Sequence, residues 1–164
     1  MKFRVVGDIV AYKNPKASFS GKIHMYSPKE MKIYQTAISL IARNYMQINN
    51  LAPISGAVKL SIWAYFKIPK SFKGSKLKHI LGGTFKHTVK PDRTNILKCI
   101  EDAVKDICFG DDCVVTEGQI KKSYCKQIDQ KTYFDIEICA APIITENYDE
   151  YDETEYLINT YVIK

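Results

Sequence analysis

Residues whose types and spacing suit phosphate chemistry lie within a single stretch of the chain, residues 90–115. Asp92 comes before an apolar pattern with helical spacing, and Asp111 and Asp112 follow the end of that pattern. If the two ends of this helix converge, the carboxylates suit a hard cation such as Mg²⁺, which binds through one or two carboxylates plus substrate phosphates. Lys98, a turn into the helix, would then neutralise a phosphate. If the ends lie apart, no metal site is needed to explain these residues. Asp92 then interacts favourably with the positive end of the helix dipole, and Asp111-Asp112 belongs to a common type of turn.

This stretch resembles the RusA family of Holliday junction resolvases, which are small dimeric endonucleases that cut four-way DNA junctions with Mg²⁺. The family pattern is Lys/Arg-Pro/Arg-Asp-x-Asp-Asn-Leu-x-Lys-x-x-x-Asp-Ala-Leu, followed after a short turn by Asp-Asp-x-x-Val. The residues of this chain that fall in register with it are Lys90, Pro91, Asp92, Asn95, Lys98, Asp102, Ala103, Asp111, Asp112 and Val115. The pattern has two separated parts with the right gap, which makes the match specific.

The resemblance implies a catalytic role for Asp92, Asp112 and Lys98. Asp92 and Asp112 would hold Mg²⁺, or Mn²⁺ in its place, with Asp111 as a further metal ligand. The ion would polarise the scissile phosphate and lower the pKa of an attacking water. Lys98 would stabilise the charge that builds up in the transition state. The resemblance therefore predicts metal-assisted hydrolysis of a phosphodiester bond.

One position departs from the family pattern. The family keeps a second catalytic acid two residues after the first, and this chain has Thr94 there. A threonine hydroxyl is a neutral and weak Mg²⁺ ligand, whereas a carboxylate brings charge. Three interpretations stay open: the site is weakened, another acid substitutes, or this chain binds junctions without cutting them. A substitution introduced to trap an inactive form is a further explanation.

The charge of the chain is unevenly distributed. The net charge of the 164 residues is +6, but residues 1–145 carry 23 basic and 12 acidic residues, a net charge of +11. A basic domain suggests a polyanionic partner, although basic surfaces also serve solubility alone. We expect a RusA-like domain over residues 1–145 and an acidic C-terminal extension over 146–164. The extension is either a solvated tail or a segment that competes with DNA for the basic surface.

Lysines outside the motif are candidate DNA contacts. Residues 67–90, here called the basic arm, hold seven lysines and no acid, and they are interpreted as a long flexible loop. The loop over residues 11–21 is also basic, and the family carries a lysine on the strand after the second motif. The candidates are Lys13, Lys16, Lys22, Lys73, Lys76, Lys78, Lys86, Lys90, Lys122 and Lys126. For each of them, a solvated surface charge is the alternative.

The apolar patterns predict the elements that position these residues. Alternation predicts strands, and an apolar stripe at helical spacing predicts helices. The expected strands are residues 2–10, 23–26, 58–66, 113–116, 119–128 and 133–140, and the expected helices are residues 28–49 and one that is capped by Thr94 or Asn95 and ends at Gly110. Trp63 and Tyr65 would stack on bases or pack beneath a helix. The expected fold is α/β (α+β): one domain with a small mixed sheet and two main helices, assembled as a homodimer.

Composition narrows the compartment and the class of protein. No apolar run approaches the length of a membrane span, and no secretory signal begins the chain. Five cysteines without a CxxC pair favour reduced thiols, and the histidines are not placed to complete a zinc site. We therefore expect a cytoplasmic protein, or one of the nucleoid or a viral factory, that is not secreted and has no membrane partner.

The expected partners are four-way junction DNA and a second copy of the chain. Two symmetric nicks in a junction need two active sites related by a two-fold axis. The predicted function is a Mg²⁺-dependent endonuclease that resolves Holliday junctions by paired nicks. A junction-binding protein without cutting activity is the main alternative. A general single-strand or RNA-binding module would explain the charge but not the paired acid motif.

Overall fold

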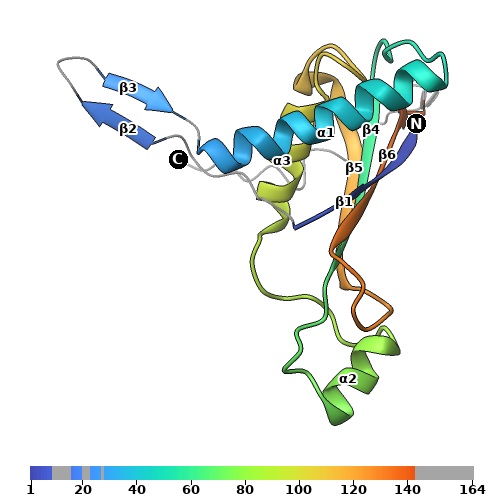
Figure 1. Ribbon diagram of the computed structural model, residues 1–164. Coiled ribbons are helices and arrows are strands. Elements are labelled where there is room, and N and C mark those ends of the chain that lie inside the picture. Colours follow the sequence, from blue (N-terminus) through green and yellow to red (C-terminus); the bar gives the residue numbers. More distant parts are fainter. Residues whose placement is uncertain (9–15, 20–22, 27, 143–164) are drawn as a thin grey trace, which may run out of the picture.

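The computed structural model describes residues 1–8, 16–19, 23–26 and 28–142. Within them, a four-stranded sheet has the order β1-β6-β4-β5, and β2 pairs with β3 in a separate two-stranded sheet (Figure 1). The elements in chain order are β1 (Lys2–Val6), β2 (Lys16–Phe19), β3 (Ile23–Tyr26), α1 (Lys29–Ile48), β4 (Val58–Phe66), α2 (Gly74–Leu81), α3 (Arg93–Val104), the 3₁₀ turn η1 (Asp112–Val114), β5 (Val115–Tyr124) and β6 (Tyr133–Ala140). This confirms the expected α+β fold with a mixed sheet and two main helices, α1 and α3, to which the described part adds the short helix α2.

Strand β4 is central to the main sheet. It pairs antiparallel with β6 and parallel with β5, while β1 pairs antiparallel with the other edge of β6. A hairpin cannot join two parallel strands, so the connection from β4 to β5 is a long crossover that contains α2 and α3. As a result α3 lies beside β5 and runs in the opposite direction (Figure 1).

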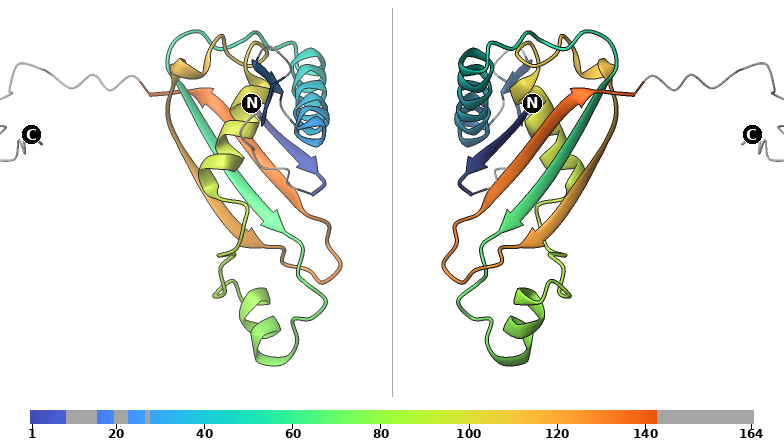
Figure 2. Two further views of the ribbon diagram at one scale, coloured as in Figure 1. Left: turned by 90° about the vertical axis from the view of Figure 1, so that its left-hand side faces the viewer. Right: turned by 90° about the vertical axis from the view of Figure 1, so that its right-hand side faces the viewer.

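Both long helices cover the same face of the sheet. Figure 2 shows α1 and α3 on one side of the strands and an uncovered sheet face on the other. The core between them consists mainly of aliphatic side chains with the aromatic ring of Phe134, and the aliphatic residues include Ile38, Ala42, Leu60, Ile62, Ile96, Ile100 and Ile136. This packing fixes α3 against the sheet and so fixes the residues at its two ends.

Trp63 and Tyr65 lie half-buried on the sheet face that no described helix covers. The Tyr65 ring stacks on Tyr133 with ring centroids 4.7 Å apart, and Lys2 Nζ lies 5.7 Å from the centroid of the Trp63 ring. The expectation that these aromatic residues pack beneath a helix is therefore wrong.

Two segments that the sequence predicts as loops contain regular structure. Strand β2 lies within residues 11–21, and helix α2 lies within the basic arm. The arm is held to the end of the sheet by aromatic contacts, since the rings of Phe72 and Phe85 lie 5.8 and 6.2 Å from that of Tyr124 at the end of β5. The basic arm is thus an anchored helical projection, not a structureless loop.

Helix α3 differs from the expected helix at both ends. Its N-cap residue is Asp92, and not Thr94 or Asn95, and its last residue is Val104. Asp106 has a φ of 60°, which is outside the helical region, so the chain leaves the helix well before Gly110.

Strand β5 is continuous where the sequence predicts two strands around residues 117–118. Gly118 lies inside it with a φ of 153°, and a Cβ atom there would come within 1.8 Å of the Leu60 carbonyl oxygen. The glycine is therefore required by the close approach of β5 to β4 and does not mark a turn.

Among the helices that the structure describes, none combines the length and the apolar character needed to cross a membrane.

Candidate active-site groove

An open groove of about 530 Å³ runs between α3 and β5. Its helical wall is formed by Arg93, Thr94, Leu97 and Glu101, and its other wall by residues 115–120 of β5 with the adjacent Leu60. Because α3 and β5 run in opposite directions, the groove extends from the N-terminal turn of α3 to the start of β5. The acid positions of the motif lie near these two ends.

Asp92 lies at the first end of the groove. Its backbone is extended, its carbonyl oxygen accepts the first hydrogen bond of α3 from the Ile96 amide, and its side chain is exposed. Its carboxylate accepts no capping hydrogen bond from the described helix. Thr94, in the first turn, is also exposed, and this turn contains no acid. The Asp92 carboxylate is therefore available to an external ligand.

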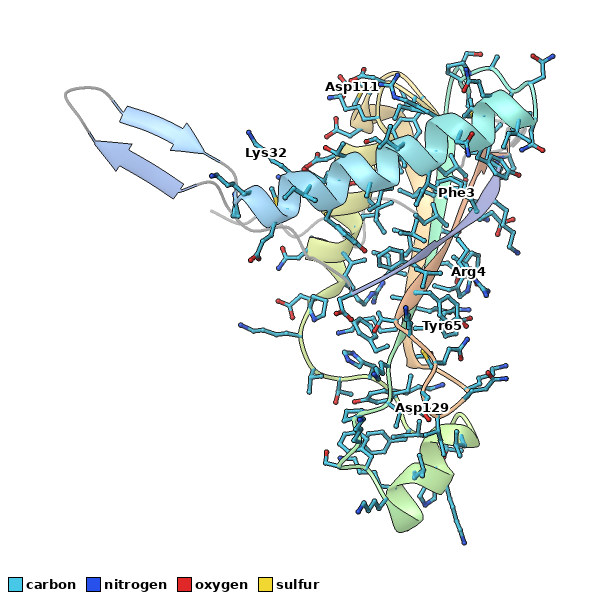
Figure 3. All side chains as sticks on the ribbon, in the orientation of Figure 1. Phe3, Arg4, Lys32, Tyr65, Asp111 and Asp129 are labelled. Carbon is cyan, nitrogen blue, oxygen red and sulfur yellow. The ribbon has the colours of Figure 1, made fainter. Side chains whose placement is uncertain are left out.

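Asp111 lies at the other end, beyond the C-terminus of α3 (Figure 3). Lys105 Nζ donates to Asp111 Oδ1 at 2.8 Å, and the same oxygen accepts the backbone amide of Asp112 at 2.7 Å. The hydrogen bond from Lys105, followed by interactions with the side chain and the backbone of Asp112, lowers the pKa of Asp111 to about 2. Asp112 is also exposed, and its Oδ1 lies 3.9 Å from Lys105 Nζ. The Asp111 carboxylate therefore caps the η1 turn and pairs with a lysine.

The structure does not bring Asp92 and Asp112 together within one chain. They flank the twelve residues of α3, which at 1.5 Å per residue make a helix about 18 Å long. Two oxygen ligands of one Mg²⁺ lie within about 4 Å of each other. Consistent with this, no group of three or more His, Cys, Asp or Glu side chains that could hold a metal occurs among the described residues.

Lys98 and Glu101 occupy the helix between these ends. Thr94, Lys98 and Glu101 follow one another at spacings of four and three residues, which places them on the same face of α3. Lys98 is exposed. Burial raises the pKa of Glu101, and Asp112 raises it further, while Lys98 opposes the shift. Glu101 is thus an acid of the groove that sequence reasoning missed, although its spacing from Thr94 could have identified it.

The lysines of the basic arm differ in their surroundings. Lys73 is the N-cap residue of α2, and Lys78 and Lys90 are exposed. Lys76 Nζ lies 3.6 Å from the centroid of the Phe72 ring and 5.2 Å from that of Phe85. Lys86 Nζ donates to the carbonyl oxygen of Gly83 at 3.2 Å. All of these lysines are exposed, but Lys76 is also held by two aromatic rings, so Lys73, Lys78 and Lys90 are better placed for a phosphate.

Of the remaining candidate DNA contacts, the structure describes the side chains of only two, Lys122 and Lys126. Lys126 follows β5 and is exposed. Lys16 begins β2, but its side chain is outside the described part, and Lys13 and Lys22 lie outside it altogether. Lys122 was expected to face DNA, yet its Nζ donates to the backbone carbonyl oxygens of Val89 and Pro91 at 2.6 Å each. Its ammonium is therefore directed into the protein.

Comparison with known proteins adds two findings. A family model described as endodeoxyribonuclease RusA matches residues 7–138 of the chain. The uncharacterized protein YqaN of Bacillus subtilis (strain 168) is 31% identical over 130 residues, which cover 77% of this chain and 89% of that protein. The family match includes α3, both walls of the groove and the basic arm.

Proposed function

The chain belongs to the RusA endodeoxyribonuclease family, and from this we propose that it binds four-way DNA junctions and resolves them by paired nicks. Family membership implies an endonuclease that acts on Holliday junctions. The observation that carries the proposal is the groove between α3 and β5, which has the exposed Asp92 at one end, directly after the acid-free basic arm in the chain.

DNA binding is assigned to the arm and the groove together. The arm carries lysines and no acidic residue, so it presents a positive electrostatic potential that attracts phosphates. Arg93, exposed at the groove wall, follows the arm three residues after its end. Such contacts hold the backbone of DNA and do not read its sequence. They support the recognition of a branched structure more than that of a particular base sequence.

We propose Mg²⁺, or Mn²⁺ in its place, as the cofactor. Asp92 fits a magnesium ligand because its carboxylate is exposed and makes no capping bond with the described helix. Asp112 is also exposed, but it fits a ligand only at the other end of the groove. Asp111 fits least, because Lys105 already holds its carboxylate. When bound, the metal supplies a polarised phosphate and a water of lowered pKa.

Lys98 is proposed to stabilise the developing negative charge on the phosphate. Its side chain is exposed, on the same face of α3 as Thr94, so it is accessible to a phosphate that lies along the helix. A charged donor aimed at the place where charge develops contributes more to the rate than to ground-state binding. Four residues further along the helix, Asp102 Oδ2 accepts a hydrogen bond from Gln35 Nε2 at 3.3 Å, which ties α3 to α1.

A homodimer is part of the proposal, because paired nicks need two active sites related by symmetry. An apolar stripe on α1 supports it. Ile33, Leu40 and Ile48 are 70%, 61% and 75% exposed, and their spacing of seven and eight residues places them on one helix face. Leu40 is at the middle of this stripe, so two copies of α1 can pair antiparallel about a two-fold axis at Leu40.

The proposal also includes the bounds of the nuclease domain and a cytoplasmic location. Residues 1–145 form the nuclease domain, and the acidic extension over 146–164 lies outside the described residues. All five cysteines are free thiols, which supports a reducing, cytoplasmic compartment.

A non-cleaving junction-binding protein is the second candidate, and Thr94 is the observation that favours it. The side chain lies in the groove, where the family has its second acid, and the first turn of α3 contributes no carboxylate. Binding and cutting are separated by one assay on a synthetic four-way junction and a linear duplex of the same sequence, with Mg²⁺ or with EDTA. The proposed function predicts preferential binding of the junction and Mg²⁺-dependent nicks at symmetric positions. Equal binding of both DNAs would contradict it.

A further inference from the structure

Lys122 has surroundings unlike those of the other strand and arm lysines. It is in register with the buried Ala64 of β4, so its side chain extends from the helix-covered face of the sheet. Its Nζ donates to the carbonyl oxygens of Val89 and Pro91, both at 2.6 Å. These carbonyls lie on either side of Lys90, in the segment that joins the basic arm to α3. One ammonium group therefore holds the backbone of this segment at two points.

The segment over residues 86–91 has few other anchors. No backbone–backbone hydrogen bond joins it to any other described residue. The ring of His87 is buried, stacks on Phe66 with centroids 3.6 Å apart and planes 9° apart, and lies 4.9 Å from the Tyr124 ring. Among the described residues, Lys86 Nζ contacts only the nearby Gly83 carbonyl oxygen. The His87 ring and the Lys122 ammonium are therefore the contacts that tie the segment to the sheet.

Asp92 follows this segment directly. Its backbone continues from Pro91, whose carbonyl Lys122 holds, and its own carbonyl accepts the Ile96 amide at 3.1 Å. Burial lowers the pKa of Lys122, and the charge of Asp92 opposes that shift, so the two side chains are electrostatically coupled. Since the half-buried Lys122 ammonium already donates to two carbonyls, it is poorly placed to bind a phosphate.

We propose that Lys122 is a positioning residue, which holds the segment before α3 so that the Asp92 carboxylate stands at the end of the groove. The catalytic meaning of this role rests on the proposed function. Its structural content does not, because it concerns contacts within the protein that exist without metal or DNA.

The test compares Lys122→Met, which keeps the apolar stem, with Lys122→Arg, which keeps a cation with several donors. Lys121→Met is the matched control, because Lys121 is exposed and is in register with Trp63 on the other sheet face. Hydrogen exchange of the Ile96 amide is measured in the metal-free and DNA-free protein. We expect about tenfold faster exchange in Lys122→Met, because two hydrogen bonds from a charged donor are lost. Exchange should be restored in Lys122→Arg and unchanged in Lys121→Met.

Two functional measurements complete the test. Junction affinity of Lys122→Met should stay within about twofold of the parent. In a Thr94→Asp background, which restores an acid to the first turn of α3, Lys122→Met should raise the Mg²⁺ concentration that gives half-maximal nicking. Unchanged Ile96 exchange together with a loss of junction affinity as large as that of Lys126→Met would overturn the proposal and make Lys122 a DNA contact. Faster exchange in a protein that nicks no junction even when Thr94 is replaced by Asp would leave the positioning role intact and would contradict the proposed function instead.

Discussion

Asp92 and Asp112 lie at opposite ends of helix α3, whose twelve residues span about 18 Å. One Mg²⁺ cannot bridge them in a single chain, so in the proposed complex each carboxylate would meet a different part of the DNA or a different subunit. The groove lies between the two positions, with Arg93 and Thr94 near the first and Val115 and Thr116 near the second. This separation changes the expected chemistry from one cluster of three acids to two acidic positions along a groove.

The separation predicts how metal binding responds to substitution. Asp92→Asn and Asp112→Asn should each weaken the binding of Mn²⁺ to the DNA-free protein at separate sites, and the effects in the double variant should add within about 0.5 kcal/mol. The measurement is a Mn²⁺ titration followed by electron paramagnetic resonance. A strongly non-additive loss would show that the two carboxylates share an ion, and would contradict the separation.

Salt dependence tests the role of the basic arm. Each phosphate contact contributes about 0.9 to the slope of log K against log salt, so the variant with both Lys73→Ala and Lys78→Ala should lower the slope by about 1.8 for a junction with duplex arms. Both lysines are exposed and carry no acid neighbour in the arm. Lys32→Ala, on α1, is the control and should leave the slope unchanged. The same slope in all three proteins would exclude the arm from the DNA interface.

The dimer is tested at the centre of the apolar stripe of α1. Leu40 is 61% exposed and lies between Ile33 and Ile48. Leu40→Glu should make the protein a monomer in sedimentation equilibrium. The free energy of unfolding of the monomer should not fall, because the new charge is exposed to solvent in the single chain. Lys32→Glu introduces the same side chain to the side of the stripe and should leave the dimer intact. A wild-type protein that is already a monomer at high micromolar concentration would contradict the dimer itself.

His87 predicts a dependence of stability on pH. Burial, and then the charge of Lys122, lower its pKa to about 4 from an ordinary value of 6.5. Between these two values the unfolded chain binds more protons than the folded one. The stabilisation is therefore complete above pH 6.5 and is lost as the pH falls through 4. His87→Phe keeps a ring against Phe66 and should make the urea midpoint of unfolding less dependent on pH between pH 4 and 6.5. If the midpoint of this variant changes with pH as much as that of the parent, other groups cause the pH dependence.

Alternation of apolar residues was sufficient for the central strands. The sequence predicts both β4 and β6 with their observed bounds, because Leu60, Ile62, Phe134 and Ile136 alternate with polar or half-buried neighbours. Helix α2 could not be predicted in this way. It is only eight residues long, and it is held by contacts between Phe72, Phe85 and the distant Tyr124, which no local pattern contains.

The candidate site could be predicted only in part. The motif identifies its residue types and the helix that carries Lys98, but it contains no information on how the rest of the chain folds around that helix. Lys122 shows the difference most clearly. The sequence identifies a lysine on the strand after the motif, while the register of that strand decides that Lys122 turns inward and Lys121 outward.

The threonine at position 94, where the family keeps an acid, should limit the rate of cutting. Thr94 is exposed in the groove, in a first helical turn without acids, so an aspartate there is compatible with the helix dipole. Removal of one catalytic group commonly costs on the order of 10²–10³ in rate. The parent should therefore bind junctions but cut them slowly or not at all.

The most direct measurement is Mg²⁺-dependent nicking of a synthetic four-way junction by four forms of the protein. These are the parent, Thr94→Asp, Thr94→Asp with Asp92→Asn, and Thr116→Asp as a control that adds the same charge at the other end of the groove. We predict cutting by Thr94→Asp at least about 10²-fold faster than by the parent, abolished again by Asp92→Asn and not reproduced by Thr116→Asp. Full cutting by the parent with no gain in Thr94→Asp, or cutting that survives Asp92→Asn, would contradict the assignment of the active site to this end of α3.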